Sequence, residues 1–292
     1  MRRSSLLLLP LAVAVAGAAA GDRAGSTGES RLFAALRAAR QIDAPVEPLA
    51  EARRPAVRHL FEDSLTAADP GALAGRWHDL GFELIRGGAD RWWIAEREGS
   101  RRGRGVYAFH ATTPGPLVTA PHGVPNDDML TAEIVVGLFE AAGVRAAGWS
   151  TVRREEIDLA HADDTVFHQF VLAFAATAPR SSVVEVHGFA QDKRRTVAGR
   201  RADAILSNGT RRPDSELRAA AGCLADGLGV RAGIYPEIAE LGGTTNSQGK
   251  ALRQRGSDRF VHLELSRPLR QRLAAEQADL DHLARCVVGG EG

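Results

Sequence analysis

The chain has 292 residues, of which 44% are hydrophobic and 25% are charged. These values are typical of a globular protein, and they disfavour both an intrinsically disordered chain and a polytopic membrane protein. The 37 basic and 36 acidic residues nearly cancel, so no basic surplus exists to drive binding to nucleic acid. The length suits one substantial α/β domain or two small ones.

The first 20 residues have the pattern of a secretory signal peptide. Arg2 and Arg3 form a positive start, residues 6–16 are apolar, and the small residues 18–20 provide a cleavage site. We therefore expect a periplasmic or secreted protein whose mature chain begins near Gly21 and has no stable membrane insertion. The alternative is that the segment is kept as an uncleaved anchor.

Residues 21–75 form an extension that is flexible at its start and then helical, interrupted by several prolines. From residue 76 onward the pattern changes to strands separated by glycine-rich turns. Three strands are predicted in this part, over 82–85, 91–98 and 106–111. Their short connections indicate an antiparallel meander at the edge of a sheet.

The rest of the chain alternates between short apolar runs and segments with helical spacing of apolar residues. Strands are predicted over 117–120, 144–149, 182–187, 202–206, 231–235 and 260–265, and helices over 128–142, 164–177, 214–228 and 268–285. This alternation predicts an α/β domain over 76–288, with a mainly parallel mixed sheet flanked by helices on both faces. The helical and antiparallel parts before it form an N-terminal extension of that domain.

The chain has two cysteines, Cys223 and Cys286. In an oxidising compartment they could form a disulfide between a late helix and the C-terminal one. Two buried thiols at helical positions are an equally good interpretation. Two isolated cysteines cannot form a structural zinc site by themselves.

Two histidines, His122 and His187, lie where apolar strands end, and each is followed by glycine. Open α/β sheets bind ligands at the carboxyl ends of their strands, so both imidazoles are in the expected region. A single histidine in such a place is more often structural. Two of them in matching surroundings indicate a metal site.

A carboxylate for the same site comes from Asp127 or Asp128, which follow His122 in the next loop. One of the two aspartates could instead cap the helix that begins there. Two histidines and one carboxylate leave a coordination position open for water, as in catalytic zinc sites. The predicted cofactor is therefore Zn²⁺.

Glu264 is a charged residue in the otherwise apolar last strand, which is costly unless the residue is paired or functional. It shares a strand face with His262, because side chains alternate with a period of two. One interpretation is a buried ion pair with Arg267 or another arginine. The other is a general base or acid beside the metal.

Several motifs in this chain resemble the N-formylglutamate amidohydrolase-like branch of the zinc carboxypeptidase clan. They are the sequences APHG at 120–123, VEVHGF at 184–189, SNG at 207–209, TTN at 244–246 and HLELSR at 262–267. The resemblance covers about residues 117–273 and implies a zinc carboxypeptidase-like fold of the phosphorylase/hydrolase type.

The resemblance also implies roles for individual residues. His122 and His187 match the two histidine ligands of the clan, Glu264 matches its catalytic glutamate, and Arg267 matches an arginine that helps to hold an acidic substrate. The clan places its carboxylate ligand three residues after the first histidine, where this chain has a proline. The ligand is therefore Asp127 or Asp128, and Asp128 is favoured.

Three further residues, Thr165, Asn208 and Asn246, lie in polar loops and are candidates for binding substrate. Thr165 belongs to a segment that resembles the clan's substrate-binding region, and an ordinary helix cap is the alternative interpretation. The two asparagines lie in glycine-rich turns that could donate hydrogen bonds to a substrate carboxylate.

Together these features predict a secreted zinc-dependent amidohydrolase or carboxypeptidase-like enzyme that cleaves an amide bond next to a carboxylate. Its substrate would be a small acidic compound or a peptide, and we expect a monomer. The alternative is a catalytically inactive periplasmic protein of the same fold that binds a small acidic ligand.

Overall fold

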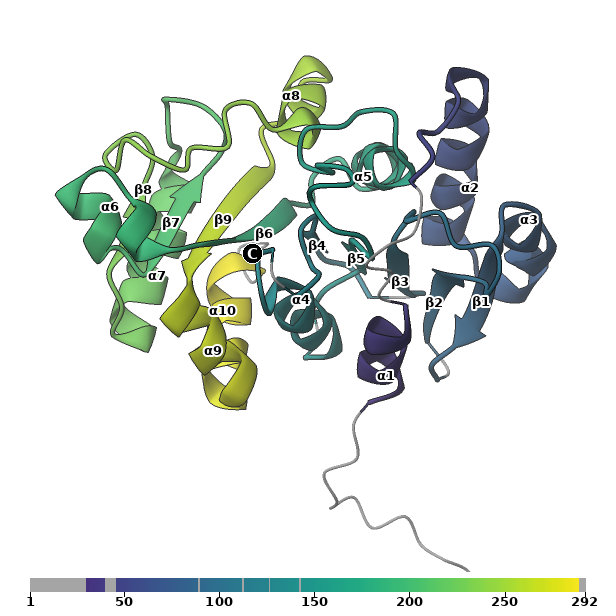
Figure 1. The fold of residues 1–292 in the computed structure, drawn as a ribbon, viewed down its shortest axis with the longest axis horizontal. Helices are drawn as coiled ribbons and strands as arrows, with labels where there is room; N and C mark the ends of the chain where they lie inside the picture. Colours follow the sequence, from purple (N-terminus) through teal and green to yellow (C-terminus); the bar gives the residue numbers. More distant parts are fainter. Residues whose placement is uncertain are drawn as a thin grey trace, which may run out of the picture.

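A computed structural model of the chain describes residues 30–39, 46–88, 90–111, 113–125, 127–141 and 143–288 (Figure 1). The predicted signal peptide, residues 1–20, lies outside the described residues. Among the residues that are described, no helix is both long and apolar enough to cross a membrane.

The described residues contain one nine-stranded sheet with the order β1-β2-β3-β5-β4-β6-β9-β7-β8. The strands are β1 (Phe82–Arg86), β2 (Arg91–Glu96), β3 (Val106–His110), β4 (Leu117–Ala120), β5 (Ala146–Trp149), β6 (Val183–Phe189), β7 (Ala204–Ser207), β8 (Ala232–Ile234) and β9 (Phe260–Ser266). The central strands β5, β4, β6 and β9 are parallel, whereas β1, β2 and β3 form an antiparallel edge. The predicted mixed α/β sheet and its antiparallel meander are confirmed.

Helices cover both faces of this sheet (Figure 1). Residues of α1 (Arg31–Ala38), α4 (Thr131–Glu140), α7 (Ser215–Leu228), α9 (Arg267–Ala275) and α10 (Gln277–Val287) pack in one apolar core. Residues of α2 (Arg54–Thr66), α3 (Ala74–Asp79), α5 (Val166–Thr177) and α8 (Ser247–Gln254) pack in the core on the opposite face. The short helices are α6 (Val197–Arg201), η1 (Glu51–Arg53), η2 (Pro70–Leu73) and η3 (Gln191–Lys193).

The N-terminal extension is packed against the sheet through aromatic side chains. Phe61 of α2 is fully buried, and its ring centroid lies 4.9 Å from that of Tyr107 and 5.0 Å from that of Phe170. Aromatic pairs at these separations contribute beyond the area that they bury, by about 0.5–1.5 kcal/mol each. The helix before the sheet and the helix α5 on the sheet therefore share one core.

The helices differ from the predicted ones in three main respects. The predicted helix 268–285 is two helices, because Glu276 has an extended backbone conformation that ends α9. The helix predicted over 128–142 begins only at Thr131, since Leu130 before it has a positive φ of 73°. Helix α8 was not predicted, because its sequence SQGKALRQ offers few apolar residues to show a period.

Cys223 of α7 and Cys286 of α10 are joined by a disulfide with a Cα–Cα distance of 5.6 Å. The bond decides between the two interpretations that the sequence left open. It closes a loop over a sequence separation of 63 residues, and so it restricts the unfolded chain considerably.

Replacing both cysteines, as Cys223→Ala together with Cys286→Ala, should therefore lower the free energy of unfolding by about 2–4 kcal/mol. Urea denaturation followed by circular dichroism would measure this loss. A reducing agent should lower the midpoint of the unsubstituted protein and leave that of the double variant unchanged. Equal midpoints for the two proteins under oxidising conditions would contradict the assignment.

Candidate metal centre and active site

The two predicted histidine ligands meet at the carboxyl ends of neighbouring parallel strands. His122 follows β4, and His187 lies in β6, which pairs with β4 in parallel. Their ring centroids are 5.1 Å apart and the ring planes are inclined by 68°. Both side chains are buried, so their polar atoms must find partners inside the protein.

Asp128 lies between the two imidazoles. Its Oδ2 atom is 3.2 Å from Nδ1 of His122 and 3.5 Å from Nδ1 of His187. Asp127 points elsewhere, because its Oδ2 accepts a hydrogen bond of 2.7 Å from the backbone nitrogen of Arg154. Of the two aspartates that the sequence offered, the structure brings Asp128 to the histidines.

The three side chains His122, Asp128 and His187 are suited to bind one metal ion. Ligands at about 2.0–2.2 Å from a tetrahedral zinc ion are about 3.3–3.6 Å from one another. The two separations of 3.2 and 3.5 Å agree closely with this range. Two imidazoles and a carboxylate are also the ligand types that catalytic zinc sites use.

Each histidine is held from behind by a second carboxylate. Asp158 Oδ1 lies 2.8 Å from Nε2 of His122, and Glu185 Oε1 lies 2.8 Å from Nε2 of His187. Such carboxylates fix the orientation of a metal-binding imidazole and raise its basicity. Neither carboxylate was predicted from the sequence. For Glu185 a signal existed, since it is a charged residue in an apolar strand two positions before His187.

The carboxylates shift the pKa values of the histidines in the metal-free protein. Burial opposes protonation of His187, but its hydrogen bonds to Asp128 and Glu185 outweigh burial and raise its pKa to about 10. Burial also opposes protonation of His122, whose pKa is nevertheless raised by Asp128 and Asp158. The same contacts hold the pKa of Asp128 well below its usual value, against the effect of its burial. His187 is therefore protonated near neutral pH in the absence of a metal, and protonation of His122 is favoured relative to a free imidazole.

Glu264 lies on β9 directly beside His187 on β6, in the parallel register of the two strands. The side chain is buried, and its Oε2 atom has no hydrogen-bond partner within the described part of the chain. Burial raises the pKa of Glu264 to about 7, although the positive charge of His187 acts in the opposite direction. The carboxyl group is thus poised to exchange a proton at physiological pH, as a general base or acid requires. The other interpretation of Glu264 was an ion pair with Arg267 or another arginine, and among the described residues no such pair forms.

His262 completes a square of ionisable side chains on one face of β6 and β9. It lies opposite Glu185 in the register, and its ring centroid is 4.4 Å from that of His187. Its Nε2 atom is 3.8 Å from Oε1 of Glu264. Burial and the nearby charge of His187 lower the pKa of His262 well below its usual value, so this imidazole is neutral.

A cavity of about 530 Å³ opens beside His187 and Glu264. Cationic side chains outnumber anionic ones in its lining. The cationic side chains are Arg154, Lys193, Arg194, Arg267 and Arg270, and the anionic ones are Asp127, Asp128 and Glu264. Arg267, which the sequence predicts to bind substrate, is exposed at the start of α9 and lines this cavity. The lining favours a ligand that carries negative charge.

Arg270 supports the loop that carries Asp128 and was not identified from the sequence. Its side chain is buried and donates hydrogen bonds to the carbonyl oxygens of Met129, at 2.7 Å, and of Leu265. The guanidinium occupies the space beside Gly188, where an added Cβ would lie 2.3 Å from Nη1 of Arg270. The glycine after His187 therefore makes room for this arginine.

The other three residues predicted to bind substrate do not line this cavity. The hydroxyl of Thr165 caps α5 by accepting from the backbone nitrogen of His168. Asn208 donates to the carbonyl oxygen of Arg212 in its own turn. Asn246 is buried and donates to Glu185 behind the metal ligands. A role of these residues in substrate binding stays a prediction.

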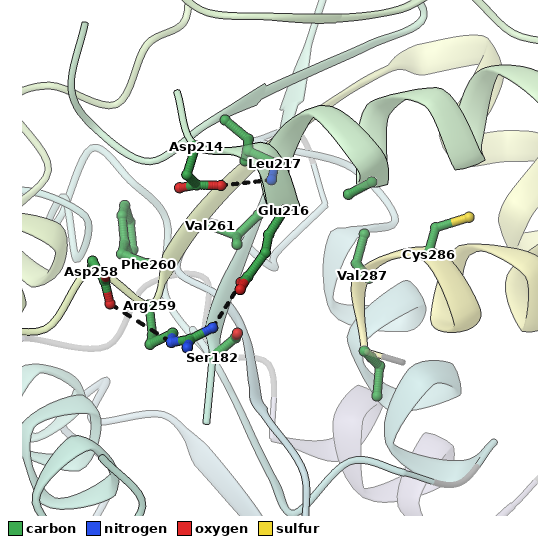
Figure 2. Close-up of a pocket in the computed structure, with 12 residues that line it drawn as sticks. Ser182, Asp214, Glu216, Leu217, Asp258, Arg259, Phe260, Val261, Cys286 and Val287 are labelled. Atoms are coloured by element: carbon green, nitrogen blue, oxygen red, sulfur yellow. Dashed lines mark hydrogen bonds and ion pairs between the residues drawn. The ribbon is translucent and has the colours of Figure 1, made fainter. Parts of the chain in front are cut away.

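A second pocket lies at the other end of β6 and β9, away from the histidines (Figure 2). Its volume is about 80 Å³, and Arg259 lies in it between Glu216, at 2.7 Å, and Asp258, at 3.7 Å. Figure 2 also shows Asp214 capping α7 through the backbone nitrogen of Leu217. The paired charges and the small volume set it apart from the cavity at the histidines.

The raised pKa values of the two histidines predict that metal binding depends on pH. Zinc binds only the neutral imidazole, so binding near pH 7 should release up to about two protons per ion, from His122 and His187. Because both pKa values are raised, the affinity should increase as the pH rises from 6 to 9. Calorimetry in two buffers with different ionisation enthalpies measures the proton release. A zinc affinity that is independent of pH over this range would contradict the proposed ligands.

No protein-family model and no curated protein matches the chain. Solved structures do match. The succinylglutamate desuccinylase from Chromobacterium violaceum is similar over 80% of this chain and 77% of its own, with 12% identity and a TM-score of 0.42. A "putative carboxypeptidase A" from Shewanella denitrificans is similar over 65% of this chain, with 9% identity and a TM-score of 0.40, and the match spans 62% of that protein's length. A "putative metallopeptidase" from the same organism is similar over 85% of this chain and 95% of its own, with 12% identity and a TM-score of 0.34.

Carboxypeptidase, metallopeptidase and desuccinylase structures are thus what this chain is similar to. At identities of 9–12% such a likeness concerns the fold at most, so the function has to be inferred from this chain's own residues.

Proposed function

We propose that the protein is a zinc-dependent hydrolase that cleaves an amide bond next to a carboxylate, like amidohydrolases and carboxypeptidase-like enzymes. One observation carries the proposal. The Nδ1 atoms of His122 and His187 converge on Asp128, beside a buried Glu264 that faces a cationic cavity.

In this proposal His122, Asp128 and His187 hold the zinc ion. A bound zinc ion supplies Lewis acidity, which polarises a carbonyl group and makes water more acidic. The protein contributes the orientation of the ligands, since Asp158 and Glu185 keep the Nδ1 atoms of both histidines directed at Asp128. It also keeps the Asp128 carboxylate ionised, so this ligand does not have to lose a proton.

Glu264 moves the proton. Its pKa of about 7 lets the carboxylate accept a proton from the attacking water, and lets the resulting acid give it up to the leaving nitrogen. The neutral His262 on the same strand face adds no charge that would hold Glu264 ionised. The buried position of Glu264 also limits access of bulk water to the proton.

The cationic lining of the cavity binds the carboxylate of the substrate. Arg267 presents an exposed guanidinium, which can bind a carboxylate through two parallel hydrogen bonds. Lys193 lies in the same lining and is also exposed. These groups bind a charge that does not change during the reaction, so they serve affinity and orientation more than the chemical step.

A second candidate function is binding of a small acidic ligand without turnover. The excess of cationic side chains in the cavity favours it, because such a lining needs no metal to attract an anion. Metal analysis separates the two functions. About one zinc ion per chain supports the hydrolase, and a chain that stays metal-free after zinc supplementation supports the binding protein.

We further propose that the protein is exported, on the basis of the signal-peptide pattern of residues 1–20. The disulfide between Cys223 and Cys286 suits an oxidising compartment. Mass spectrometry of the exported protein should find an N-terminus near Gly21. An N-terminus at Met1 would show that the segment is retained.

Two substitutions should separate catalysis from metal binding. Glu264→Gln keeps the shape of the side chain but cannot accept a proton, so it should lower turnover by about 10²–10⁴ while zinc stays bound. Asp128→Asn removes the charge of a ligand and should weaken zinc binding itself. Assays of zinc content and of amide hydrolysis on N-acyl amino acids measure both effects.

The matched control is Asp127→Asn, because Asp127 is the neighbouring carboxylate and does not contact the histidines. Asparagine can still accept the hydrogen bond from the backbone of Arg154, so zinc affinity should hardly change. If Glu264→Gln unfolds the protein while activity per folded molecule persists, Glu264 is a structural residue and the mechanism is wrong.

A further inference from the structure

The two carboxylates behind the histidines are connected through one dipeptide, Thr245–Asn246. On one side, Asp158 Oδ2 lies 3.0 Å from Nδ1 of His161, and Nε2 of His161 lies 3.1 Å from Oγ1 of Thr245. On the other side, Nδ2 of Asn246 donates to Oε1 of Glu185, the atom that also contacts His187. Together with the contacts of Asp128, these contacts close a ring. One arm runs from Asp128 through His122, Asp158 and His161 to Thr245, and the other runs through His187 and Glu185 to Asn246.

We propose that Thr245 and Asn246 are positioning residues of the metal centre, which together set the orientation of both histidine ligands. The inference rests on the proposed metal site and assigns these residues a place behind the ligands, not in the substrate cavity. Neither residue touches the predicted metal position, so each acts through a carboxylate and an imidazole.

Hydrogen bonds fix the position of the dipeptide Thr245–Asn246. Asn246 caps α8, since its Oδ1 accepts a hydrogen bond of 2.8 Å from the backbone nitrogen of Gly249. This bond leaves the amide nitrogen directed at Glu185. The next residues tie α8 to the loop that carries Asp158, because Ser247 N donates to Ala160 O and Gln248 Nε2 donates to Leu159 O, both at 2.8 Å.

The two arms of the ring differ in burial, which predicts an order of effects. Glu185 is fully buried, and its Oε2 atom has no partner among the described residues, so it depends on His187 and Asn246. The side chain of Asp158 is 28% exposed and also binds Arg154 at 2.8 Å. Without the Asn246 contact, the buried carboxylate of Glu185 lacks one of its two hydrogen-bond partners. On the more exposed Asp158 arm, a water molecule can take the place of the Thr245 hydroxyl.

The deciding experiment measures the dissociation constant of zinc alone, by competition with a chromophoric chelator, in four variants. Asn246→Ser keeps a good helix cap and loses the donor to Glu185, and it should weaken zinc binding by about 10–100-fold. Thr245→Val removes only the hydroxyl and should weaken binding by less. Asn246→Asp keeps the cap and places a carboxylate against Glu185, so it should be the most damaging of the three.

The fourth variant adds Glu185→Gln to Asn246→Asp. The double variant removes the repulsion between two buried carboxylates and keeps one negative charge at the pair, so it should recover part of the affinity that Asn246→Asp loses. A purely structural role of Asn246 would give no such recovery. Asp214→Ala is the control, because it removes the cap of α7 at the far end of the sheet (Figure 2). It should lower the melting temperature and leave zinc affinity unchanged.

The outcomes distinguish this inference from the proposed function. If Asn246→Ser folds and binds zinc within twofold of the unsubstituted protein, the inference is overturned and the proposed hydrolase is unaffected. If Asn246→Ser does not fold, Thr245→Val decides, and an unchanged affinity overturns the inference. If the unsubstituted protein binds no zinc, both proposals fail.

Discussion

The arrangement of the candidate site depends on the carboxylate of Asp128. It accepts from two buried imidazoles, and each imidazole is backed by a further carboxylate, from Asp158 or Glu185. Charges therefore alternate along one row in a region of low dielectric. Such a row is stable only when every member is present, because removing one leaves a neighbour uncompensated. A divalent cation that displaces the two imidazole protons leaves the net charge of this row unchanged, so the row can accept such an ion without a new charge imbalance.

The sheet explains why this row can be buried at all. Val184 and Val186 of β6 pack into one apolar core. Glu185 and His187, which alternate with them along the strand, face the opposite side of the sheet. The alternation of side chains along a strand thus confines the charges to one face. Because β9 runs parallel to β6 and in register, Glu264 comes to lie beside His187 without any special loop. The regular geometry of the sheet, and not a flexible segment, sets the distance between the proposed base and the ligands.

The sequence predicted those parts of the fold and site that depend on local pattern. Most of the strands were predictable because they are short apolar runs, and His122, His187 and Glu264 stood out because each interrupts or ends such a run. Helix α8 was missed because it is largely polar and is held by its contacts with the rest of the protein. Asp158 and Arg270 were missed for a similar reason. Their partners lie 36 and 141 residues away in the chain, and no local pattern records such a contact.

The pairing of Gly188 with Arg270 has a consequence for how this protein can diverge. The guanidinium fills the place that a side chain at position 188 would need, and it also holds the carbonyl of Met129 next to the strained backbone of Leu130. A substitution at position 188 would displace the arginine and release the turn that presents Asp128. Evolution could therefore alter the glycine only after position 270 had changed and another contact had taken over the turn. The order in which these two positions mutate is constrained, although they are far apart in the chain and neither performs chemistry.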